Sequence, residues 1–173
     1  MLLDLMRDAA IRSVIVIAGV YGMALLFNLS TLFLERLFHW LRFMKFLHWP
    51  IGFLYGVAGP IHELFHSAWC TIFRLRIHSI KERETRFVLD TNNLMQLTGC
   101  FFACLGPTIT CSLLLFIVLK HLPPLLVIPF IPPLSIIGTA SRTDVVGSFL
   151  GLIPAFFFTC VMITAFRFVI SLI

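Results

Sequence analysis

The sequence predicts an all-α polytopic membrane protein with four to five transmembrane helices and a small β-hairpin insert. The chain of 173 residues is 60% hydrophobic and 12% charged, with a mean hydropathy of +1.02. A soluble domain is about half apolar and about a quarter charged. The few charges also divide this chain into long apolar runs, and a helix needs about 20 such residues to cross a bilayer. We therefore expect one integral membrane domain over residues 1–173.

Five apolar runs are the candidate spans. They are Ser13–Leu34, Phe46–Phe73, Thr91–Leu119, His121–Ser141 and Val145–Phe166. Only the second run contains a charged residue, Glu63. The first run is too long for the apolar part of a signal peptide and shows no clear small-residue cleavage site, so we expect a retained anchor.

The fourth run leaves the number of spans between four and five. Residues 122–144 read "LPPLLVIPFIPPLSIIGTASRTD", and their five prolines are expected to preclude a regular helix. Irregular backbone at membrane depth survives only where protein or a watery cavity covers it. We therefore expect this stretch to line such a cavity.

One clearly polar segment, residues 75–92, lies between the second and third runs. Its pieces "LRIHSI" and "TRFVLD" are short, β-leaning and separated by charge, which predicts a hairpin lying at the membrane surface. An irregular polar loop is the alternative.

Basic residues set the expected orientation, because Lys and Arg favour the cytosolic side. If the first three runs span, the N-terminus and the hairpin share one side. The basic residues of that side are Arg7, Arg12, Arg74, Arg76, Lys81, Arg83 and Arg86, and those of the other side are Arg36, Arg42, Lys45 and Lys120. We expect a cytosolic N-terminus and hairpin, in the plasma membrane of a prokaryotic cell.

The charge and cysteine content argue against a nucleic-acid-binding protein and against a disulfide-stabilised protein. The net charge of +5 lies mostly between apolar runs, which indicates membrane topology, and no nucleic-acid-binding signature is present. The five cysteines lie inside apolar runs without a C-x-x-C pair. They are expected to be small buried side chains without disulfides.

A metal-binding pattern lies in the second apolar run. Residues 59–69 read "GPIHELFHSAW", so His62, Glu63 and His66 form an H-E-x-x-H motif. On a helix this motif places two histidines on one face to bind one Zn²⁺, and its glutamate acts as the base toward water. Ionisable residues inside a membrane are costly and usually functional. Two hydrogen-bonding histidines beside a protonated glutamate are the structural alternative.

Gly59-Pro60 indicates a fresh helix start or a kink, unless the glycine serves only helix packing.

A catalytic zinc needs three protein ligands and one open position. Asp144 is the favoured third ligand, because it is the only acidic residue bordering the last two runs and follows the proline-rich stretch. Its alternative role is capping the N-terminus of a helix. The other candidates are Asp90, His78, Glu84 and His121.

The order of these elements resembles the site-2 protease family of intramembrane zinc metalloproteases. The resemblance covers residues 50–155 and depends on "HELFH", the polar insert, "GCFFACLGPTITCSLLLF" and an aspartate that opens a later span. It implies His62, His66 and Asp144 as zinc ligands, Glu63 as catalytic base and Gly106-Pro107 as the family's Gly-Pro element.

The chain also departs from the family pattern. Phe65 and Val145 replace glycines, the Asn-x-x-Pro element is not recognisable, and no PDZ-like domain is inserted. These departures indicate a distant or minimal branch of the family.

The expected function is hydrolysis of peptide bonds in or near transmembrane segments, with one Zn²⁺ as cofactor. The resemblance implies a single-pass membrane protein or a leftover signal peptide as substrate. An extended substrate segment is expected to pair with the hairpin edge near Ile77–Ile80 or Phe87–Leu89. Two alternatives remain: a non-catalytic zinc-binding membrane subunit, and a small transporter component that moves metal ions or protons past the histidines and Asp144.

Overall fold

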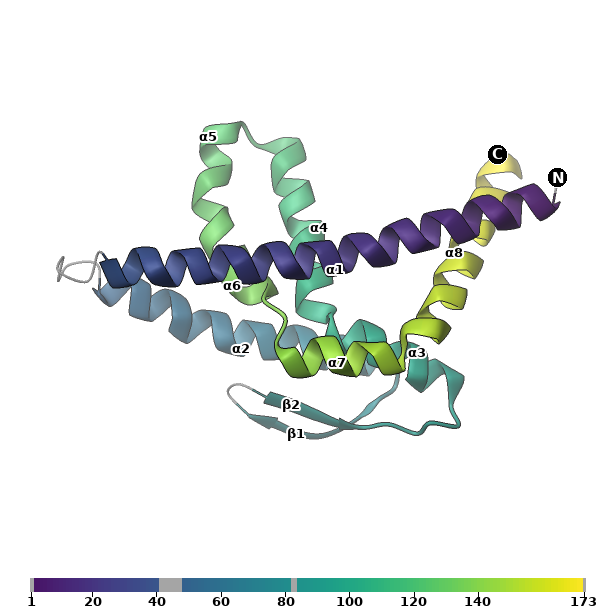
Figure 1. Cartoon of the computed structure of the whole chain (residues 1–173), viewed down its shortest axis with the longest axis horizontal. Helices are drawn as coiled ribbons and strands as arrows, with labels where there is room; N and C mark the ends of the chain where they lie inside the picture. The colour runs from purple at the N-terminus through teal and green to yellow at the C-terminus, as the bar shows by residue number, and fades with distance from the viewer. Residues whose placement is uncertain (1, 41–47, 82–83, 173) are drawn as a thin grey trace.

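The computed structural model describes residues 2–40, 48–81 and 84–172, and helices dominate this part of the chain (Figure 1). The predicted hairpin is the only sheet among these residues. The elements are α1 Leu2–Trp40, α2 His48–Ile72, β1 Arg76–Lys81, β2 Glu84–Val88, α3 Leu94–Cys104, α4 Gly106–His121, α5 Pro124–Val127, the 3₁₀ helix η3 Ile128–Phe130, α6 Ile131–Gly138, α7 Arg142–Leu150 and α8 Leu152–Leu172.

Two to four helical units are apolar enough to cross a membrane, against the four to five spans expected. Helices α1 and α8 meet this criterion alone, and two bent pairs meet it if each pair is one span. One pair is α3 with α4, bent by 60°, and the other joins Pro124–Gly138 to α7 with a bend of 64°. The second run forms α2, which does not meet the criterion because its histidines, glycines and Glu63 lower its hydropathy.

The prediction of an irregular stretch over residues 122–144 is wrong for most of its length. Residues 124–138 are helical, because the prolines fall in the first turns of α5, η3 and α6, where no backbone N–H is needed. Only residues 139–141 are irregular between α6 and α7. The last predicted run, Val145–Phe166, is divided at Gly151 into parts of α7 and α8.

The polar insert forms a hairpin, as predicted. Strands β1 and β2 are antiparallel, and Arg76 pairs with Val88. The register shifts between Ile77 and Ser79, which leaves a β-bulge at His78. Three of the predicted topogenic residues, Arg42, Lys45 and Arg83, lie outside the described residues.

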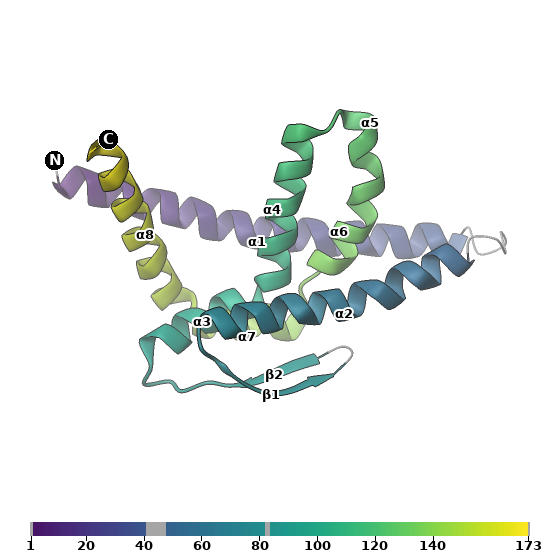
Figure 2. The same ribbon diagram turned by 180° about the vertical axis from the view of Figure 1, so that it is seen from behind.

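The helices form two groups around α1 and α2. Helices α4 and α6 pack together as a helical hairpin closed by α5, and both also contact α1 and α2 (Figures 1 and 2). Helix α3 packs against α2, α7 and α8, while the β-hairpin lies against α2. The second half of α2 is therefore flanked by α3, α6 and the hairpin.

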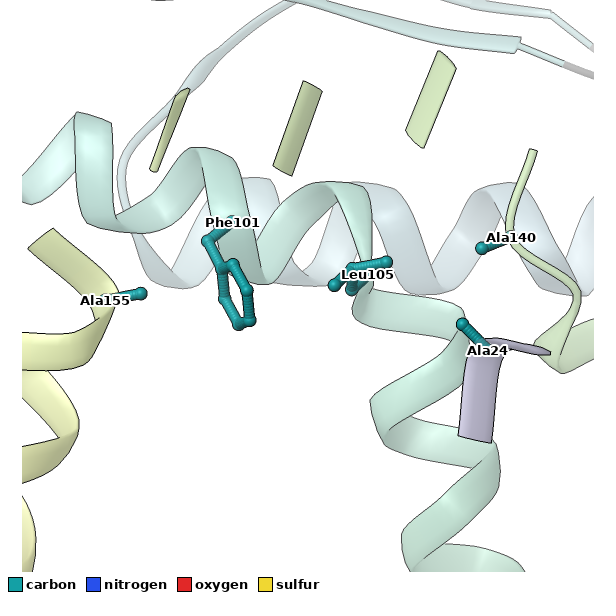
Figure 3. Packing of buried hydrophobic residues seen from close by; sticks show 5 residues of the cluster. All are labelled: Ala24, Phe101, Leu105, Ala140 and Ala155. Carbon is teal, nitrogen blue, oxygen red and sulfur yellow. The ribbon is translucent and has the colours of Figure 1, made fainter. Parts of the chain in front are cut away.

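One core cluster, around Phe101 and Leu105, contains mostly small side chains. Phe101 of α3 is 1% exposed and Leu105 is fully buried, and alanines of α1, α8 and the α6–α7 connection pack around them (Figure 3). Figure 3 shows Phe101 between Ala155 and Leu105, with Ala24 and Ala140 beyond Leu105. The five cysteines are free and four of them are buried, as expected for small apolar side chains.

The bend between α3 and α4 lies at Gly106-Pro107. A Cβ atom at Gly106 would lie 2.4 Å from Cδ1 of Trp69 on α2, so a larger residue would push the two helices apart. Pro107 occupies the first turn of α4, where its ring is well tolerated. These two residues keep the end of α3 in close contact with α2.

Candidate metal centre

His62 and His66 lie one turn apart on the same face of α2. Their ring centroids are 4.6 Å apart, and their Nε2 atoms face each other at 2.9 Å. Helix α2 runs from His48 to Ile72 with Pro60 inside it. Gly59-Pro60 therefore begins no new helix, and the motif occupies continuous helix.

Each histidine ring is oriented by a backbone carbonyl from another helix. His62 Nδ1 lies 2.7 Å from the carbonyl oxygen of Ile137, and His66 Nδ1 lies 2.6 Å from that of Ala103. Both carbonyls belong to the last turns of helices, where backbone acceptors lack helical partners. For Ala103 the residue four positions later is Pro107, which has no N–H to donate. Pro107 thus leaves the Ala103 carbonyl as an acceptor for His66.

These hydrogen bonds fix the tautomers of the two rings. A carbonyl oxygen only accepts, so Nδ1 of each histidine carries the proton and Nε2 presents a lone pair. When both rings are neutral, their two lone pairs face each other at 2.9 Å and repel unless a proton or a metal ion lies between them. An Nδ1–H donated to a backbone carbonyl is also the usual outer contact of a metal-binding histidine.

Asp144 lies beside the two histidines, far from them in sequence. Its Oδ1 is 3.7 Å from His66 Nε2, and its side chain is 17% exposed. One ligand atom each from His62, His66 and Asp144 lie within 4.8 Å of one another, a group that can hold a metal ion. The structure therefore brings together the three residues proposed as ligands.

Asp144 also has the capping role considered as its alternative. It is the third residue of α7, and its Oδ2 accepts from Ser141 N at 2.8 Å while its own N–H donates to Ser141 Oγ at 3.1 Å. This capping box leaves Oδ1 directed toward the histidines. Capping and metal binding therefore use different oxygens of one carboxylate.

The other candidate third ligands lie elsewhere. Asp90, His78 and His121 are exposed and do not belong to the group. Asp90 Oδ1 instead accepts from Asn92 N at 3.0 Å in a local turn. Glu84 begins β2, and its side chain lies outside the described residues.

Glu63 is 5% exposed and is held by the hairpin. Its Oε2 accepts a hydrogen bond from Thr85 Oγ1 on β2 at 2.6 Å. Three residues of β2, Thr85, Arg86 and Phe87, line the same cavity as Glu63, together with Leu89 directly after the strand. The predicted base is therefore buried next to the predicted ligands.

Two cavities of about 550 Å³ each meet at the candidate site. One extends under the hairpin and includes His66 and Asp144, while the other follows α2 along Gly52–Gly59. Both cavities are lined by His62, Glu63 and Ser141. A chain longer than one side chain therefore has space on both sides of the predicted base.

Two residues that replace family glycines have packing roles. Phe65 packs against the cluster of Phe27, Cys111 and Ile137 below the site, and Val145 packs against the core cluster around Phe101. Neither residue belongs to the metal-binding group.

Sequence reasoning missed the groups that orient the site. Thr85 and the carbonyl of Ile137 carry no local signal, because nothing in the sequence tells which backbone or side-chain group a distant residue will meet. Pro107 was the one usable signal for Ala103, since a proline four residues later frees a helical carbonyl.

Comparisons of the chain with protein-family models, curated proteins and solved structures find no match. The relationship to site-2 proteases therefore stays a hypothesis based on the motifs and their order.

Proposed function

We propose that this protein is an intramembrane zinc metalloprotease that hydrolyses peptide bonds in or near transmembrane segments of other membrane proteins. The observation that carries the proposal is the convergence of His62, His66 and Asp144 in one cavity with Glu63. Three protein ligands with a free position beside a buried carboxylate are typical of catalytic zinc sites.

The donor set supports zinc as the metal. Zinc accepts neutral imidazole nitrogens at about 2.0–2.1 Å and carboxylate oxygens at about 2.0–2.2 Å, usually in tetrahedral geometry. Tetrahedral nitrogens at that range lie about 3.3 Å apart, a few tenths of an ångström more than the 2.9 Å between the two Nε2 atoms. Small rotations of the two rings therefore suffice for His62 and His66 to bind one ion.

Each residue of the site then has a separate part in the proposed hydrolysis. When bound, zinc supplies Lewis acidity that polarises a peptide carbonyl and acidifies water. Glu63 is the general base, which takes a proton from water and delivers it to the leaving amine. Thr85 holds Oε2 of Glu63 and leaves Oε1 to face the reacting water. The hairpin and α7 limit access of bulk water to this carboxylate.

The apolar helices support a substrate within the membrane. Two to four units are long and apolar enough to span, and a single-pass membrane protein or a leftover signal peptide is the substrate class that the family resemblance favours. A helix hides its peptide bonds, so the substrate must unwind before cleavage. The hairpin offers an unpaired strand edge to an extended segment.

A reconstituted cleavage assay tests the proposal. Purified protein in liposomes, with zinc added, is incubated with a panel of single-pass membrane proteins and signal peptides. We expect zinc-dependent cleavage within or beside the apolar segment, and its loss with a chelator and in Glu63→Gln. Zinc binding without cleavage of any panel member would favour the non-catalytic subunit. Zinc or proton flux across the liposomes would favour the transporter component.

A further inference from the structure

The connection between α6 and α7 is bound by side chains from four helices. His62 of α2 contacts the Ile137 carbonyl, Thr108 Oγ1 of α4 donates to the Gly138 carbonyl at 2.7 Å, and Asp144 of α7 accepts from Ser141 N. Helix α1 supplies the remaining contacts. Because the end of a helix leaves carbonyls without partners, these side chains complete the hydrogen bonding of buried backbone.

Asn28 of α1 makes the most specific of these contacts. Its Oδ1 accepts from Ala140 N at 3.1 Å, and its Nδ2 donates to Ala140 O at 3.0 Å. One side-chain amide thus pairs with both backbone groups of one residue, as a neighbouring β-strand would. Thr31, one turn later on α1, contacts the Thr139 hydroxyl at 2.9 Å. Ala140 is 4% exposed, so its backbone would be costly to leave unpaired.

Ala140, the residue that Asn28 binds, lies directly before the capping box of α7. Ser141 follows Ala140 and binds the backbone and carboxylate of Asp144. Fixing Ala140 therefore fixes Ser141 and the first turn of α7. Since Ser141 binds Oδ2, the same turn determines where Oδ1 of Asp144 lies relative to His66, 3.7 Å away.

We infer that Asn28 is a positioning residue for the metal ligand Asp144. Asn28 is not one of the proposed metal ligands and does not contact Glu63. It acts through Ala140 and the start of α7. The inference depends on the metal site proposed above. The inference adds a residue of α1 to that site, whereas the family resemblance covers only residues 50–155.

Zinc affinity of the full-length protein in detergent micelles, measured by competition with a chromophoric chelator, tests this role. Asn28→Ala should lower the affinity about tenfold, the lower end for outer contacts of a metal site. The same substitution should have no further effect in Asp144→Ala, because residues that act through one another are not additive. Co²⁺ spectra should show a changed coordination geometry in Asn28→Ala.

Ser13→Ala is the matched control. Ser13 is likewise a polar residue of α1 and is fully buried, but its hydroxyl donates to Ala9 O within its own helix. The Ser13→Ala variant should bind zinc with wild-type affinity. If Asn28→Ala does not fold, Thr31→Val carries the test, with an expected loss of about threefold for one neutral hydrogen bond and the same dependence on Asp144.

The outcomes separate this inference from the proposed function. Wild-type affinity in Asn28→Ala, or a full additional loss in the Asp144→Ala background, would overturn the positioning role and leave the metal site intact. Wild-type protein that binds no zinc would refute the metal site and this inference together. A purely structural Asn28 would lower only the unfolding temperature of the metal-free protein.

Discussion

Thr85 donates a hydrogen bond from its hydroxyl to Oε2 of Glu63 across 2.6 Å, joining the start of β2 to the predicted catalytic base. The two residues are 22 positions apart and belong to elements with opposite character, one polar and one largely apolar. The contact gives the hairpin a role besides its proposed one of presenting an edge to substrate. It holds the carboxylate in one orientation within the cavity.

Replacing Thr85 with Val should lower cleavage at least about tenfold, because a hydrogen bond to a charged group contributes roughly 1.5–3 kcal/mol. Zinc content should not change, and Thr85→Ser should recover most of the activity. Val88→Thr is the control, since Val88 lies on the outer face of β2 and is 57% exposed. Equal cleavage rates in Thr85→Val and wild type would remove the hairpin from the positioning of Glu63.

Purified protein should contain about one zinc ion per chain, and His62→Ala or His66→Ala should lose it, because each removes one of three ligands. Elemental analysis of the purified variants measures this directly. His78→Ala is the control, because His78 is exposed on β1. Full zinc retention in the double variant of His62 and His66 would reject the metal site and the function built on it.

Glu63→Gln should abolish cleavage, with a loss of at least about a hundredfold as expected for removal of a general base. Zinc content should stay near wild type, because Glu63 acts on water and is not a ligand. Glu35→Gln, an exposed change on α1, should leave both properties unaltered. Undiminished proteolysis in Glu63→Gln would exclude Glu63 from the mechanism.

Asp144 serves as cap and as ligand, and two substitutions separate these roles. Asp144→Ala should weaken zinc binding and stop cleavage, and loss of the capping-box contact should also destabilise the protein by about 1 kcal/mol. Asp144→Asn keeps an oxygen for Ser141 N but loses the negative charge, so it should weaken zinc binding with a nearly unchanged unfolding temperature. Asp90→Ala and Glu84→Ala should bind zinc and cleave normally. Wild-type zinc affinity in both Asp144 variants would remove Asp144 from the metal site.

The features predictable from the sequence were those with local physical signals. The hairpin follows from two short β-leaning pieces separated by charge, and the spacing of His62 and His66 determines their common face on a helix. Asp144 was found because it is an isolated acid at the start of a late apolar run. In the structure it lies in the group with both histidines.

Other features depend on contacts that no local pattern encodes. The prolines of residues 123–133 were expected to prevent helix, but their positions in first turns make them compatible with it. Helix α2 was counted as a span from its length, yet its polar residues keep it below the apolar criterion. Thr85 and Asn28 were missed because each acts on a residue that only the tertiary fold brings near.

The separation of these contacts along the chain has a consequence for biosynthesis. His62 receives its orienting carbonyl from a residue 75 positions later, and Asn28 meets Ala140 across 112 positions. Domains fold from the N-terminus as the ribosome elongates the chain. A nascent chain that ends before α6 therefore carries both histidines with neither the carbonyl that orients His62 nor the carboxylate of Asp144. The three residues of the proposed metal site are complete only when α7 has been synthesised, so under the proposed function an unfinished chain would be inert.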